Sequence, residues 1–149
     1  LLWLIAVTGQ AIARNSHLLI GVSPFTAAGP CTDMIVYELT AATLAAVVSG
    51  LHLNPAAAAR NKHPERSTGM EARICAETGH AVARNGIRRS DANDVVKKIL
   101  AEYENDIPDA PLGKRLDECY HLGSVRPTDE YLETYERCKA KLKTFGLMV

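Results

Sequence analysis

Residues 33–50, DMIVYELTAATLAAVVSG, form the segment that most limits how this chain can fold. The spacing predicts a helix, and that helix is apolar on almost every side. Gly50 stands where a left-handed residue would end it. A helix with so little polar surface has to be covered on most of its sides.

The residues before this helix have the pattern of a strand and a loop in an α/β protein. Residues 18–22 are a short apolar run, typical of a strand buried on both faces of a parallel sheet, although a run this short does not exclude a piece of helix. The Pro/Gly-rich stretch GVSPFTAAGPCTD then leads from Gly21 to Asp33. Such loops often carry chemistry, because free N–H groups at the following helix start can hold anions or polarised oxygens. This loop is our candidate site.

Apolar periodicity and helix start and stop residues predict the remaining helices. They cover residues 1–15, 68–86, 90–105 and 127–146. Thr68 and Glu71 have the spacing of a capping box at the start of the second of these. Residues 51–66 are predicted to be a loop, and residues 111–126 to be irregular.

The chain therefore divides near residue 52. We expect a short α/β half, residues 1–52, and a mainly helical half, residues 53–149, so that the chain alone is mostly α. The predicted strand at 18–22 has no visible partner in the sequence. Its backbone groups would stay unpaired, at a cost of several kcal/mol, unless another chain supplied neighbouring strands.

Composition excludes several classes of function. Seventeen basic residues balance 17 acidic ones, so the net charge favours neither nucleic acid nor a membrane as partner. The apolar opening LLWLIAV ends after about seven residues, too short for a membrane span, and has no basic segment before it. The four cysteines form no CxxC pair and the five histidines no HxxxH pair, so we expect no metal site and reduced thiols in the cytoplasm. The first residue is leucine, and we expect the chain to be a piece of a longer protein.

Three separate motifs in one order carry a family resemblance. They are GPCTDM at 29–34, TGMEAR at 68–73, and PLGKRLDECY followed by RPTDEYLETYERCKAKL between 111 and 142. With these motifs the sequence resembles the C-terminal third of the monomethylamine methyltransferases, the amine-to-corrinoid methyltransferases of methylotrophic archaea. The resemblance runs from about Ala27 to the end, while residues 1–26 match mainly by position.

The resemblance implies a TIM barrel that moves a methyl group from a methylamine to the cobalt of a separate corrinoid protein, with a pyrrolysine in the substrate cavity. Residues 1–50 would be the closing units of the barrel, and Gly21–Asp33 the loop after its final strand. This placement agrees with the loop being the candidate site, because barrel enzymes work at the carboxyl ends of their strands. The pyrrolysine position would lie upstream of this chain.

The resemblance also implies where substrate would bind. Ser23 and Phe25 stand where the family has a glutamine and a tyrosine facing the substrate. Phe25 could offer a ring face to a cationic amine, or the pair could plug the barrel mouth. Cys31 could be a reactive thiol or a buried inert one, and Thr32 and Asp33 could cap the helix or contact substrate. We expect these five residues to be the substrate-binding set, and no catalytic residue is identified.

The leading hypothesis is that the chain is part of a cytoplasmic methylamine methyltransferase of methanogenesis, inactive by itself. It would bind no cofactor directly, because the corrinoid belongs to its partner protein, and it would act as a homo-oligomer or with a complementing barrel fragment. The alternative is a non-catalytic helical assembly module derived from the end of such a barrel. A thiol redox protein would need a low pKa at Cys31 and a resolving cysteine, which the spacing does not supply.

Overall fold

The computed structural model describes residues 1–56 and 59–149. The helices in these residues are α1 (Leu2–Asn15), α2 (Asp33–Val47), α3 (Gly69–Asn85), α4 (Arg89–Leu100), α5 (Leu116–Cys119) and α6 (Asp129–Thr144), with 3₁₀ turns η1 (Pro64–Arg66) and η2 (Glu104–Asp106). The strands are β1 (Gly21–Val22), β2 (His52–Leu53), β3 (Tyr120–His121) and β4 (Arg126–Pro127).

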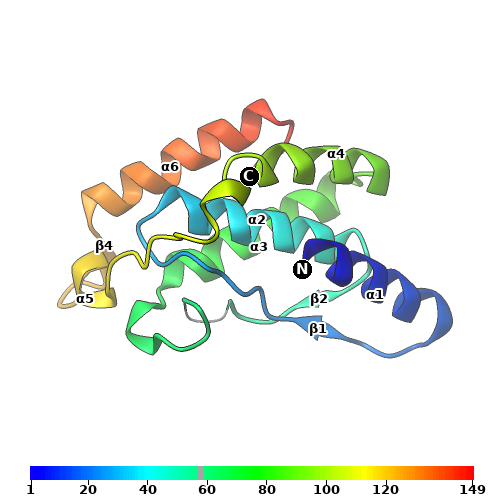
Figure 1. Ribbon diagram of the computed structural model, residues 1–149, viewed down its shortest axis with the longest axis horizontal. Coiled ribbons are helices and arrows are strands. Elements are labelled where there is room, and N and C mark those ends of the chain that lie inside the picture. Colours follow the sequence, from blue (N-terminus) through cyan, green and yellow to red (C-terminus); the bar gives the residue numbers. More distant parts are fainter. Residues whose placement is uncertain (57–58) are drawn as a thin grey trace.

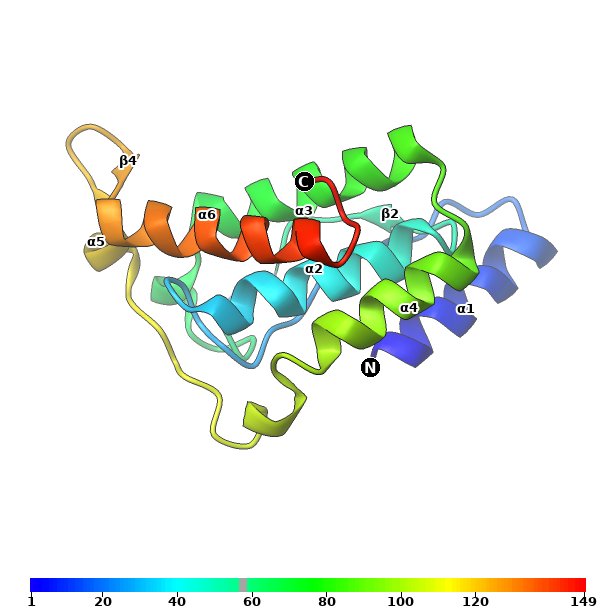
Figure 2. The same ribbon diagram turned by 90° about the horizontal axis from the view of Figure 1, so that it is seen from above.

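Helix α2 is the centre of the molecule (Figures 1 and 2). Every residue from Met34 to Ala46 is buried, and α1, α3, α4 and α6 all pack against this helix. The main core joins its apolar side chains to those of α3 and α6, with Ile35, Leu39 and Ile74 almost fully buried. The expectation that the helix predicted at 33–50 is covered on most of its sides is confirmed.

The prediction that the strand at 18–22 lacks a partner within the chain is wrong. β1 pairs in parallel with β2, in the register Gly21 to His52 and Val22 to Leu53, and α2 connects the two strands (Figure 1). His52 and Leu53 were predicted to be loop, because two residues are too few to show a strand pattern. The loop after β1 is therefore not the loop after a final strand, and the predicted boundary near residue 52 falls inside β2.

The strand is also shorter and more exposed than its apolar run indicated. Only Gly21 and Val22 are in β1, whereas the side chains of Leu18 and Leu19 are 68% and 82% exposed. Within the described residues β2 is the one strand that pairs with β1, so nothing covers these two leucines. Burial on both faces was expected because the apolar run reads as the interior of a larger sheet.

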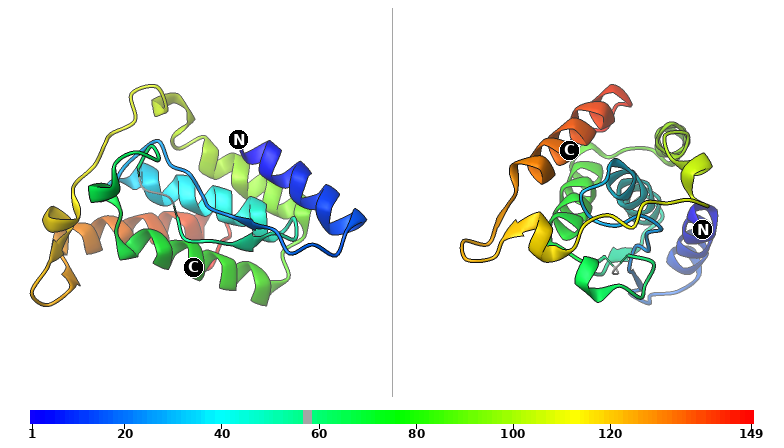
Figure 3. Two further views of the ribbon diagram at one scale, coloured as in Figure 1. Left: turned by 90° about the horizontal axis from the view of Figure 1, so that it is seen from below. Right: turned by 60° about the vertical axis from the view of Figure 1, so that its left-hand side comes forward.

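The helices of the second half follow their expected signals, except that the helix predicted over 90–105 ends at Leu100 and begins one residue early. Thr68 and Glu71 form the predicted capping box of α3, and Gly86 ends this helix with a φ of 60°. α4 begins at Arg89 and not at Ser90, because Arg88 takes the extended N-cap conformation and its Nε donates to Asp91 Oδ2 at 2.9 Å. The segment 111–126 is less irregular than expected, since it contains α5 and an antiparallel β3–β4 hairpin that projects from the body (Figure 3).

Candidate functional site

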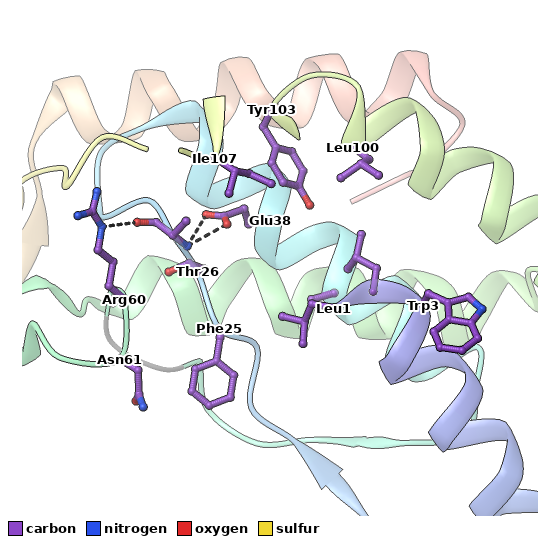
Figure 4. Close-up of a pocket in the computed structure, with 13 residues that line it drawn as sticks. Leu1, Trp3, Phe25, Thr26, Glu38, Arg60, Asn61, Leu100, Tyr103 and Ile107 are labelled. Carbon is purple, nitrogen blue, oxygen red and sulfur yellow. Dashed lines mark hydrogen bonds between the residues drawn. The ribbon is translucent and has the colours of Figure 1, made fainter. Parts of the chain in front are cut away.

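The loop from the end of β1 to the start of α2 is anchored by a carboxylate. Glu38, on the second turn of α2, accepts hydrogen bonds from the Ala27 N–H with both oxygens, at 2.9 and 3.1 Å, and from the Ala28 N–H at 3.0 Å (Figure 4). Only 9% of Glu38 is exposed. Burial raises the pKa of this carboxyl, and the two backbone donors offset part of the rise.

A second group holds the same loop from its other side. The side chain of Arg60 donates from Nε to the Ala27 carbonyl at 3.2 Å and from Nη2 to the Ala110 carbonyl at 2.6 Å. Its backbone N–H donates to the Thr26 carbonyl at 2.9 Å. Figure 4 shows Glu38 and Arg60 on opposite sides of the loop. Both the N–H and the carbonyl of Ala27 are therefore hydrogen-bonded, the first to Glu38 and the second to Arg60.

This loop forms one wall of a cavity of about 620 Å³. The cavity lies between the loop, the start of α1, the side of α2 and the segment after α4. It is lined by Leu1, Leu2, Trp3, Phe25, Thr26, Ala27, Glu38, Ala42, Arg60, Asn61, Leu100, Tyr103 and Ile107. An apolar lining with a few polar groups is usual for sites that bind small organic molecules.

The polar groups of this cavity differ in how well they are satisfied. Thr26 is 4% exposed, and its hydroxyl has no hydrogen-bond partner among the described residues. Burial, and secondarily the charge of Glu38, raises the pKa of Tyr103, so this side chain is a neutral phenol. The polar groups of the lining thus include the Glu38 carboxyl, the Arg60 guanidinium, the Asn61 amide and the hydroxyls of Thr26 and Tyr103.

The structure does not gather the five expected site residues. Phe25 lines the large cavity and is 47% exposed, whereas Ser23 does not line it. Thr32 and Asp33 lie beside a separate hollow of about 330 Å³ at the start of α2. Cys31 lines neither. A role in substrate binding stays a prediction for all five.

Two of these residues have structural partners. The Thr32 hydroxyl caps α2 by accepting from the Ile35 N–H at 3.3 Å, and the carboxylate of Asp33 pairs with Arg137. Burial, followed by the charge of Glu130, raises the pKa of the Cys31 thiol. A reactive thiol needs a lowered pKa, so of the two interpretations of Cys31 this direction favours the inert thiol.

Sequence reasoning missed the residues that hold the loop. Glu38 is the one charged residue between positions 34 and 50, and an acid within such an apolar helix was a usable signal of a buried role. Arg60 gave no comparable signal, since it sits in a basic, polar stretch. Among the described residues, no group of three or more His, Cys, Asp or Glu side chains is arranged to hold a metal ion, and none of the helices is both long and apolar enough to cross a membrane.

The family model and the individual proteins that match this chain all belong to one family. The model of the family "Monomethylamine methyltransferase MtmB" matches residues 1–147. MtmB2 of Methanosarcina barkeri is 36% identical over 138 residues, which cover 92% of this chain and 30% of that protein. MtmB1 of Methanosarcina acetivorans is 35% identical over 148 residues, which cover 97% of this chain and 32% of that protein.

Solved structures give the same result. The crystal structure of Methanosarcina barkeri MtmB matches with a TM-score of 0.89 and 32% identity, over 95% of this chain and 31% of that chain. A crystal structure of a hydroxylamine complex of MtmB matches with a TM-score of 0.87 and 33% identity. The chain therefore spans about 30% of the length of the relatives it matches.

Proposed function

Because the chain belongs to the monomethylamine methyltransferase family, we propose that it forms the C-terminal part of an enzyme that moves a methyl group from a small methylated amine to a corrinoid protein. In this proposal the β1–α2–β2 unit belongs to a TIM barrel, and the helices from α3 onward are its C-terminal extension. The location would be cytoplasmic and the pathway methanogenesis, as the family resemblance implies.

The observation that carries this proposal is the loop at the carboxyl end of β1. This loop follows a parallel strand, forms one wall of the cavity and places Phe25 in its lining. Barrel enzymes carry their substrate-binding residues at the carboxyl ends of their strands. The paired sheet has two strands in the described residues, and Leu18 and Leu19 are exposed beside it. Further strands of a barrel would cover these leucines. Another copy in a homo-oligomer, or a complementing fragment, would supply these strands.

The proposed reaction transfers a methyl cation equivalent. The carbon–nitrogen bond of a protonated methylamine breaks with its electron pair left on nitrogen, which departs as ammonia. The cobalt(I) of the partner corrinoid, acting as the second substrate, supplies both electrons of the new bond to carbon. This chain would contribute positioning of the amine, with the ring of Phe25 facing its cationic head and Ser23 near the mouth.

A complementation assay tests the proposal. We would mix the 149-residue chain with monomethylamine and a corrinoid protein reduced to cobalt(I), and follow methylation of cobalt by absorbance. A second mixture would add the separately produced N-terminal two-thirds of Methanosarcina barkeri MtmB, carrying its pyrrolysine, and a third would contain that fragment without our chain. We expect turnover only in the second mixture.

Two results would contradict this expectation in different ways. Turnover by the chain alone would show that it is a complete catalyst. A stable complex of the two fragments without any methylation would favour the alternative, a non-catalytic helical assembly module.

A further inference from the structure

We propose that Glu38 and Arg60 act as a pair of positioning residues, which bind the N–H and the carbonyl of Ala27 from opposite sides and thereby set where Phe25 lies in the cavity. The inference rests on the proposed function only in treating this loop as a substrate wall. Neither residue is expected to touch the reacting atoms.

The contacts of Glu38 indicate that its carboxyl group holds the loop. No cationic side chain within the described residues forms an ion pair with it, and its hydrogen bonds all come from the backbone N–H groups of Ala27 and Ala28. A buried carboxylate is retained only where donors compensate for lost hydration, and bonds to an ionised acceptor are stronger than bonds to a neutral one. The ionised form of Glu38 therefore holds the loop more tightly than the protonated form.

Arg60 completes the arrangement by joining three segments that are distant in sequence. It reaches the loop through the carbonyls of Thr26 and Ala27, and the segment after α4 through the carbonyl of Ala110. Arg60 and Asn61 both have left-handed backbone conformations, with φ of 52° and 53°, which residues other than glycine seldom adopt. The turn is therefore shaped to bring the guanidinium to the loop.

The position of Phe25 depends on these contacts, because Phe25 lies two residues before Ala27. Its neighbour Thr26 is fixed through its carbonyl, so the backbone on the carboxyl side of Phe25 has little freedom. When Glu38 takes up a proton, its carboxyl becomes a weaker acceptor and the loop should shift, carrying the ring with it. The other titratable or charged side chains that line the cavity are those of Arg60 and Tyr103.

Nuclear magnetic resonance on the whole 149-residue chain tests this. As the pH falls, the amide protons of Ala27 and Ala28 should shift together with a single pKa above the ordinary range of glutamate, because burial raises the pKa of Glu38. The ring signals of Phe25 should shift in the same titration. Glu38→Gln should abolish all three shifts, and Arg60→Ala should displace the Phe25 ring while the Ala28 amide still titrates.

Glu77→Gln is the matched control, because Glu77 lies on α3 and pairs with Lys139 away from the loop. It should leave the titration of Ala27 and Ala28 unchanged. If Glu38→Gln does not fold, as judged by circular dichroism, the wild-type titration decides by itself.

Three results would overturn the proposal. In the first, the amide signals of Ala27 and Ala28 do not shift with pH. In the second, these shifts persist in Glu38→Gln. In the third, the ring signals of Phe25 stay unchanged while the amide signals shift. Methyl transfer plays no part in this experiment, so failure of the complementation assay would not count against the positioning pair. Failure of the positioning pair would likewise leave the complementation assay intact.

Discussion

At the scale of single residues, Glu71 shows how a buried charge can be built into the helical half. Its side chain lies inside, with Glu71 only 3% exposed, and it accepts hydrogen bonds from the Tyr131 hydroxyl at 2.5 Å and from the Thr68 hydroxyl at 3.0 Å. The Thr68 N–H also donates to it. The capping box of α3 is thereby joined to α6, whose Tyr131 is 60 residues away.

We predict that Tyr131→Phe lowers the free energy of unfolding by about 1–3 kcal/mol, because it leaves the buried carboxylate with one donor fewer. Urea denaturation at pH 7 measures this. Tyr103→Phe is the matched control, since Tyr103 is 5% exposed and its hydroxyl makes no hydrogen bond to the described residues. Equal losses in the two variants would show that the bond to Glu71 contributes nothing.

The same carboxyl predicts a pH dependence of stability. Burial raises the pKa of Glu71 above its ordinary 4.5, and hydrogen bonds from Tyr131 and Thr68 offset only part of the rise. Between the unfolded and folded pKa values the folded state binds more protons, so the stability present below pH 4.5 is lost as the pH rises through the folded pKa. The free energy of unfolding of the wild type minus that of Glu71→Gln should therefore fall as the pH rises from roughly 4 to 7. Urea unfolding at several pH values measures this difference. A difference that grows with pH would contradict the assignment.

At the scale of elements, the helices differ in whether a side chain caps their first turn. Thr32 caps α2 with its hydroxyl, which accepts from Ile35 N–H and donates to the Gly29 carbonyl at 2.8 Å. Thr128 occupies the same position before α6 but makes no side-chain cap bond. The two threonines are a natural matched pair.

We predict that Thr32→Ala lowers the free energy of unfolding by about 1 kcal/mol and that Thr128→Ala lowers it by less than half as much. Thermal and urea unfolding of both variants would measure the difference. If Thr128→Ala were as damaging as Thr32→Ala, the loss would come from another property of threonine and not from capping.

The elements also show what could be predicted from sequence. α2, α3 and α6 were predicted because their signals are local: apolar spacing, the Thr68 and Glu71 pair, and prolines or glycines at the ends. β2 was missed because two residues carry no periodicity, and its pairing with β1 depends on the whole of α2 lying between them. For the candidate site, the loop was predicted but the groups that hold it were not, because Arg60 meets Ala27 across 33 residues and Ala110 across 50.

At the scale of the whole molecule, two backbone hydrogen bonds join the loop at the end of β1 to the segment before α5. The Gly29 N–H donates to the Pro111 carbonyl and the Lys114 N–H to the Pro30 carbonyl, each at 2.9 Å. Gly113, with a φ of 70°, lets the second segment turn at this point. The candidate site is thus fixed by residues from both halves of the chain.

We predict that Gly29→Ala disrupts this contact and lowers the free energy of unfolding by about 3 kcal/mol or more, because backbone atoms cannot rotate aside as a side chain can. A Cβ on Gly29 would lie 1.7 Å from the Leu112 carbonyl oxygen, so the two segments would have to separate. Separation would draw Ala110 away from Arg60 and loosen the cavity wall, which hydrogen exchange at the Ala27 and Ala28 amides would report as faster exchange. Gly123→Ala is the control, since nothing lies within 4 Å of its added Cβ, and it should change stability by less than about 0.5 kcal/mol. If Gly29→Ala were as mild as this control, with exchange at Ala27 unchanged, the candidate site would not depend on the distant segment.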